Sequence, residues 1–210
     1  MKNDGRLIEV VKDGYEKKET YRQQIGRYRK AMDNGFYFEA MLITYAMLED
    51  RMKSFLYYIG AFRRTEDSKL NVSTTKNILR RLYYGTEANA KGKRVDINKI
   101  STKEALIRAT LDWVNEKEGT PEEPYLAVLK KEYEGCLDIG GLLDVLDEIR
   151  EWRQYRNEVI HGLLNKNLES LNKDLVENVE LGMKYARFID SQVKALKRKD
   201  TIRKTMKIKR

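Results

Sequence analysis

Cysteine, proline and histidine are nearly absent from this sequence of 210 residues, which contains one cysteine, two prolines and one histidine. A single Cys136 cannot form an internal disulfide and is typical of a reducing compartment, so we expect a cytoplasmic protein. Pro121 and Pro124 lie close together, so little interrupts long helices elsewhere. The sequence has no apolar run of membrane-spanning length and no signal-peptide pattern at its N-terminus, so we expect no membrane partner.

The same scarcity bears on metals and cofactors. One cysteine and one histidine cannot make the clusters that bind zinc, and no glycine-rich phosphate loop of the P-loop kind occurs. Several carboxylates over 144–151 offer magnesium ligands, but a solvated acidic face is the simpler interpretation. We therefore expect no metal and no cofactor.

Basic charge is plentiful but unevenly placed. The formal net charge is +9, and residues 194–210 hold nine basic residues and one acidic residue, which together contribute +8. The basic tail over 197–210 is open to two interpretations, a solvated chain end or an arm that displaces counterions from nucleic-acid phosphates. On the second interpretation, the RNA-binding residues are Lys197, Arg198, Lys199, Arg203 and Lys204.

Apolar residues recur at helical spacing over most of the chain. A polar helix is predicted over 6–32, and the wide apolar face over 36–62 predicts a central core helix. Two further helices are predicted over 138–164, with a break at its two glycines, and over 168–196. Their short linker makes them antiparallel neighbours. The pattern predicts an all-α fold, an antiparallel helical bundle in one helical domain spanning 1–210.

Residues 63–136 read as smaller pieces beside a bundle core formed by about 36–62 and 138–196. We predict short helices after Ser73-Thr74 and through Leu82, over 105–114 and from Pro121, with an exposed loop over 85–96. The string Ser101-Thr102-Lys103-Glu104 has the spacing of a capping box before the second of these helices. We interpret 63–136 as an insertion or side layer, and no strong strand pattern occurs in the chain.

The helix over 138–164 has a charged residue in its apolar stripe. Arg156 completes the series between Trp152 and Val159, where a charge is costly unless it is paired or serves a ligand. Its guanidinium could instead reach a carboxylate while its stem packs. His161 lies about 140° from the centre of the stripe and shares a face with Asn157. His161 is therefore either a functional residue or a plain surface histidine near the helix end.

The string Arg156-Asn157-Glu158-Val159-Ile160-His161, on the third core helix of a small bundle, resembles the ribonucleases of the HEPN superfamily. These carry an arginine, four to six further residues and a histidine, often with a polar residue directly after the arginine. The run from Tyr45 to Glu49 resembles the family's first core helix, where an acidic residue often supports the site. Some family toxins have a tyrosine directly after the histidine, where this chain has Gly162. The resemblance implies a HEPN-like bundle with an inserted helical segment.

The resemblance also implies a metal-independent endoribonuclease. Such cleavage needs a base, an acid and positive charge at the phosphorane. Because one chain has one histidine, a homodimer facing its two motif helices together would complete a composite site. His161 would transfer protons, Arg156 would stabilise phosphate charge and Asn157 would orient the phosphate or His161. Glu49 would support the site by holding Arg156 or His161.

The expected products are a 2′,3′-cyclic phosphate and a 5′-hydroxyl. Family habit suggests a toxin or phage-defence role, with an antitoxin or regulatory protein as a partner. The alternative is a different class of protein, a non-catalytic helical binding module for RNA, a nucleotide or a protein partner. In that case Arg156 binds its ligand without chemistry.

Overall fold

The computed structural model describes residues 14–59, 69–71, 94–96, 98–116 and 124–205 of the chain. Over these ranges the fold is all-α, as predicted from the helical periodicity. The other regular structure in the described ranges is a short antiparallel pair of strands, β1 (Lys69–Asn71) and β2 (Arg94–Asp96). The strands were not predicted, and β2 occupies the end of the segment predicted as a loop over 85–96.

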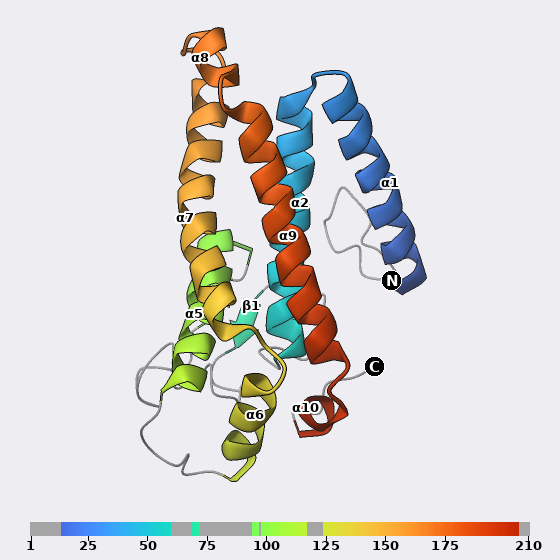
Figure 1. Ribbon diagram of the computed structural model, residues 1–210, viewed down its shortest axis with the longest axis vertical. Helices are drawn as coiled ribbons and strands as arrows, with labels where there is room; N and C mark the ends of the chain where they lie inside the picture. Colours follow the sequence, from blue (N-terminus) through green and yellow to red (C-terminus); the bar gives the residue numbers. More distant parts are fainter. Residues whose placement is uncertain (1–13, 60–68, 72–93, 97, 117–123, 206–210) are drawn as a thin grey trace.

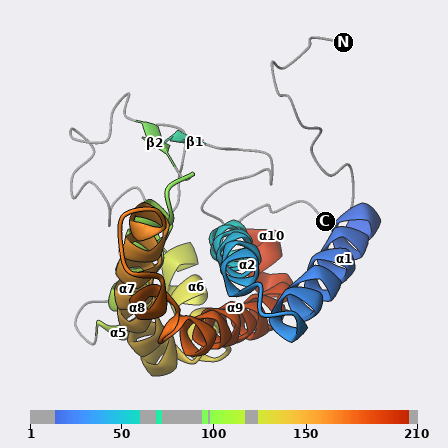
Figure 2. The same ribbon diagram turned by 90° about the horizontal axis from the view of Figure 1, so that it is seen from above.

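The central helix is α2 (Tyr37–Tyr58), which lies between α1 (Gly14–Asp33) and the rest of the bundle (Figures 1 and 2). The turn between α1 and α2 contains Gly35 at a φ of 74°, a left-handed conformation that favours glycine. Helix α2 packs along α9 (Leu175–Lys197), which runs in the same direction, since Thr44 lies near Gly182 and Tyr58 lies near Lys197. The helix predicted over 36–62 is therefore the centre of the core.

Polar contacts help to hold α1 against α2, because Ala31, which is 7% exposed, is the one buried residue of α1. Asp50 of α2 accepts hydrogen bonds from Lys17 Nζ at 2.9 Å and from Tyr21 Oη at 2.6 Å. Burial alone would raise the pKa of Asp50, but the Lys17 charge and these hydrogen bonds lower it overall. The ionised form of Asp50 therefore strengthens the attachment of α1.

The motif helix is α7 (Ile139–Gly162), and the short helix α8 (Leu168–Asn172) connects it to α9. Figure 1 shows α7 and α9 side by side and antiparallel, as predicted. Asp138 caps α7 by accepting a hydrogen bond from the Gly141 amide at 3.0 Å, and the helix runs on without the predicted break at its two glycines. The helix predicted over 168–196 is divided between α8 and α9.

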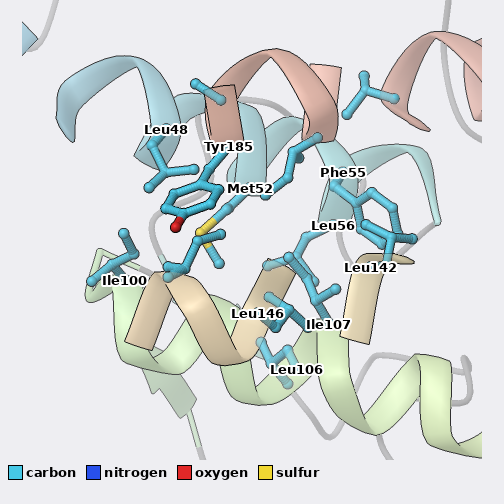
Figure 3. Close-up of a cluster of buried hydrophobic side chains, with 14 of the residues drawn as sticks. Leu48, Met52, Phe55, Leu56, Ile100, Leu106, Ile107, Leu142, Leu146 and Tyr185 are labelled. Atoms are coloured by element: carbon cyan, nitrogen blue, oxygen red, sulfur yellow. The ribbon is translucent and has the colours of Figure 1, made fainter. Parts of the chain in front are cut away.

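The segment 63–136 contributes to the core through α5 (Ile100–Asn115) and α6 (Pro124–Glu134). Helix α5 packs against both α2 and α7, so it forms one side of the bundle. Figure 3 shows the resulting cluster, in which α5 side chains meet those of α2, α7 and α9. The labelled members are Leu48, Met52, Phe55, Leu56, Ile100, Leu106, Ile107, Leu142, Leu146 and Tyr185.

The sequence predictions for this region have different outcomes. The described part of 63–136, predicted as an insertion or side layer, packs as a layer of the same core. Helix α5 begins at Ile100, so the capping-box string lies inside the helix, and the N-cap residue Lys99 makes no side-chain cap. The predicted short helix through Leu82 and the predicted helix start at Pro121 lie outside the described residues.

The basic tail predicted over 197–210 begins as packed structure. Helix α10 (Asp200–Thr205) lies against α6 and α9, and Ile202 has no exposed surface. Leu196, just before the tail, is also fully buried. Removal of the chain from Leu196 onward would therefore remove core residues as well as charge.

Candidate functional site

The apolar stripe of α7 places Arg156 on the inner side of the helix. Trp152 and Val159, one turn before and after it, are both 3% exposed. The helical spacing of the stripe also predicts a buried Leu163, but Leu163 is 42% exposed and follows the last residue of α7. The apolar stripe of α7 is therefore buried up to Val159 and exposed at Leu163.

The Arg156 guanidinium lies over the Tyr45 ring of α2, with Cζ 4.0 Å from the ring centroid. Arg156 is half-buried, and its Nε is buried without a hydrogen-bond partner. Within the described residues no carboxylate forms an ion pair with Arg156. The alternative interpretation, in which the guanidinium reaches an acidic side chain, therefore finds no partner there. The positive charge of Arg156 is thus held at an aromatic face and left uncompensated.

An aromatic layer supports this arginine. The rings of Tyr45 and Trp152 stack with centroids 6.4 Å apart and planes 20° apart. Trp152 Nε1 donates a hydrogen bond to the Asn178 carbonyl at 2.6 Å. Gly182 of α9 lies against the Trp152 ring, and a Cβ there would be 2.5 Å from Trp152 Cζ2. The glycine allows α9 to approach closely enough to fix the layer.

Asn157 and His161 lie on the outer side of α7. Asn157 is exposed and its Oδ1 accepts a hydrogen bond from Arg156 Nη1 at 3.0 Å. His161 is exposed in the last turn, and none of the described residues contacts its ring through a hydrogen bond or an ion pair. On an ideal helix His161 lies about 140° round and about 7.5 Å along from Arg156. One protomer therefore joins Arg156 to Asn157 but turns His161 away from the guanidinium.

Glu49, predicted to support Arg156 or His161, has a different partner. Its Oε1 accepts a hydrogen bond from Lys103 Nζ of α5 at 2.7 Å, and the Lys103 side chain is 2% exposed. Lys103 also donates to the Asn98 carbonyl at 3.2 Å. The contact that the structure gives Glu49 thus ties α2 to α5.

Sequence reasoning did not single out Lys103 as a site neighbour. The signal was available, because Lys103 falls on the α5 stripe at helical spacing from Ile100 and Ile107. It is a cation in an apolar series, the same pattern that drew attention to Arg156.

A second ion pair lies one residue further along α5. Arg153 Nη1 of α7 donates to Glu104 Oε2 at 2.8 Å, with side-chain exposures of 20% and 11%. The pKa of Tyr45 is raised, first by burial and then by the nearby Glu49 charge, with Arg156 and Arg153 opposing. The phenol of Tyr45 is therefore neutral. On the inner side of α2, α5 and α7, Arg156 is the one cation that has no carboxylate partner among the described residues.

The predicted RNA-binding residues lie at the other end of the bundle. Lys197 and Arg198 are exposed at the end of α9, beside α10, whereas the last turn of α7, which contains His161, lies next to α8 (Figure 1). Lys199 forms an ion pair with Glu132 at 3.2 Å. Arg203 and Lys204 belong to α10, but their side chains are outside the described ones. The structure therefore separates the motif residues from the basic residues.

No group of three or more His, Cys, Asp or Glu side chains suited to a metal ion occurs in the described part of the chain. None of the described helices is long and apolar enough to cross a membrane. Neither a protein-family model, nor a curated protein, nor a solved structure matches this chain.

Proposed function

We propose that this chain is a metal-independent endoribonuclease that acts through Arg156 and His161 in a composite site between two copies. The observation that carries the proposal is the half-buried Arg156. Its guanidinium stacks on Tyr45, and no described carboxylate neutralises it. An uncompensated cation away from bulk water is unfavourable by itself, and an incoming phosphate would offset that cost.

Other half-buried arginines of the chain provide the comparison. Arg51 stacks on Tyr21 with Cζ 3.9 Å from the ring centroid, but it also pairs with Asp190 at 2.9 Å. Arg153 pairs with Glu104. Arg156 shares the aromatic contact of Arg51 and lacks the carboxylate of both, which supports a role in binding an external anion.

The proposed chemistry assigns a task to each motif residue. A base removes the proton of the 2′-hydroxyl, the 2′-oxygen attacks phosphorus, and the bond to the 5′-oxygen breaks as an acid protonates that oxygen. The products are a 2′,3′-cyclic phosphate and a 5′-hydroxyl. His161 transfers the protons, Arg156 stabilises the phosphorane charge, and Asn157 holds the guanidinium through its Oδ1.

A second copy completes this scheme. One chain supplies one histidine, and that histidine diverges from Arg156 by about 140° on an ideal helix. Two motif helices related by a two-fold axis supply one base, one acid and two arginines to a shared cleft. Light scattering should therefore report a dimer under the conditions in which RNA is cut.

The test compares His161→Ala with wild type on single-stranded RNA in EDTA, with melting temperatures measured in parallel. We expect loss of cleavage by a factor of at least about 10² to 10⁴, with nearly unchanged stability because His161 is exposed. Gln154→Ala, at another exposed position of α7, is the matched control and should cut normally. Equal cleavage by wild type and His161→Ala would rule out the ribonuclease mechanism.

A specific feature favours the second candidate function, a non-catalytic binding module. Leu163 and Leu164, directly after the motif, are 42% and 93% exposed. These leucines add exposed apolar surface beside the motif, and contiguous exposed apolar surface is typical of protein-binding sites. If wild type binds RNA or a protein without cutting RNA, the binding module is the better assignment. A toxin or phage-defence role, with an antitoxin or regulatory protein as a partner, is proposed only together with the nuclease activity.

A further inference from the structure

We infer that Tyr45 is a positioning residue of the proposed site, whose ring holds the Arg156 guanidinium in place for a substrate phosphate. This inference rests on the proposed function. Arginine has a long side chain with several rotatable bonds, and Asn157 supplies the one hydrogen bond that the structure gives its guanidinium. The Tyr45 ring at 4.0 Å is the second contact, and it fixes the plane of the group.

The position of Tyr45 is itself strongly determined. Its ring stacks on Trp152, whose indole is bound to the Asn178 carbonyl and packed on Gly182. The chain of contacts therefore runs from α9 through Trp152 and Tyr45 to Arg156. A guanidinium on this support is placed before the phosphate arrives, which lowers the cost of ordering it during the reaction.

The carboxylates near Tyr45 are paired with other cations and do not neutralise the Arg156 guanidinium. The nearest acidic residue on the same face of α2 is Glu49, one turn further along, and Lys103 takes up its charge at 2.7 Å. Glu104 in turn pairs with Arg153. A ring can orient Arg156 without neutralising it, whereas a carboxylate in the same place would compete with the phosphate.

The role of Tyr45 is tested through its ring and its hydroxyl separately. Tyr45→Phe keeps the ring and should keep kcat within about twofold of wild type. Tyr45→Leu removes the ring and should lower kcat about tenfold, the effect of a misplaced guanidinium, with KM changed less. If Tyr45→Phe loses as much as Tyr45→Leu, the hydroxyl acts directly and the positioning role is wrong.

A double-mutant cycle separates positioning from general stability. In an Arg156→Ala background, Tyr45→Leu should cause no further loss of kcat, because the residue that it positions is gone. Tyr21→Leu is the matched control, since it removes the ring under Arg51, a second arginine stack among the described residues. It should lower the melting temperature and leave kcat unchanged. A tenfold loss from Tyr45→Leu that persists without Arg156 would overturn the inference.

The same cycle distinguishes this inference from the proposed function. If wild type does not cut RNA, the nuclease proposal fails. The coupling of Tyr45 to Arg156 is then measured on the dissociation constant of a fluorescent single-stranded RNA. Non-additive losses of affinity would support the positioning role at a binding site, and additive losses would refute it.

Discussion

Replacement of Gly182 by alanine should destabilise the protein by about 1–2 kcal/mol. The added Cβ would lie 2.5 Å from Trp152 Cζ2 and 2.7 Å from Thr44 Cγ2. Both are too close for carbon atoms, and neither neighbour can move into solvent, because Trp152 is 3% exposed and Thr44 is fully buried. Overpacking costs typically about 1–3 kcal/mol, while alanine gains up to about 1 kcal/mol over glycine in a helix.

Gly26→Ala is the matched control for this prediction. A Cβ at Gly26, within α1, would meet nothing within 4 Å, so only the gain in helix propensity of about 0.5–1 kcal/mol remains. Urea unfolding should therefore move the two midpoints in opposite directions without a change in slope. Each kcal/mol corresponds to about 2–4 °C in Tm for a chain of this size. Gly182→Ala with wild-type stability would show that α9 does not approach Trp152 as closely as the structure places it.

Three further predictions concern charges. The lowered pKa of Asp50 means that its ionised form stabilises the fold above about pH 4 and that this contribution disappears as the pH falls through the folded-state pKa. Urea midpoints should therefore fall in acid, and Asp50→Asn should flatten that dependence. Arg153→Met should cost about 1–3 kcal/mol in thermal unfolding, because it leaves Glu104 buried without a cation, and a second change, Glu104→Gln, should recover part of the loss. Replacing both Lys197 and Arg198 by serine should weaken single-stranded RNA binding and reduce its salt slope by about 1.4, whereas an unchanged slope would mean that neither residue contacts phosphate.

Periodicity was sufficient to locate Arg156 and insufficient to describe its surroundings. Arg156 was found because the buried residues Trp152 and Val159 flank it at helical spacing. Its supporting ring belongs to another helix far away in sequence, and the pattern of one helix carries no information about which side chain of another will face it. The contact between the Tyr45 ring and Arg156 could therefore be identified only from the structure.

Lys103 and Leu163 show two physical reasons for missed predictions. The string around Lys103 fits both a cap and a buried helix face, and packing against α2 and α7 extended the helix through it. Leu163 fits the stripe of α7, but a stripe is buried only where a neighbouring element covers it, and α7 ends at Gly162. Local patterns thus fail where tertiary packing continues past an expected end or stops before one.

The motif residues and the basic residues lie far apart, so we expect them to act on different steps. Asn178, which binds Trp152, and Lys197 lie on the same helix, about 28 Å apart at 1.5 Å per residue. A stacked strand that contacts both would need about eight nucleotides at 3.4 Å each. Lys197 and Arg198 cannot reach a phosphorane at Arg156 of their own protomer, so their charge can raise the rate of capture and not the rate of the chemical step. Their loss should therefore lower kcat/KM on long RNA alone, and loss of Arg156 should lower kcat on RNA of any length that is cut.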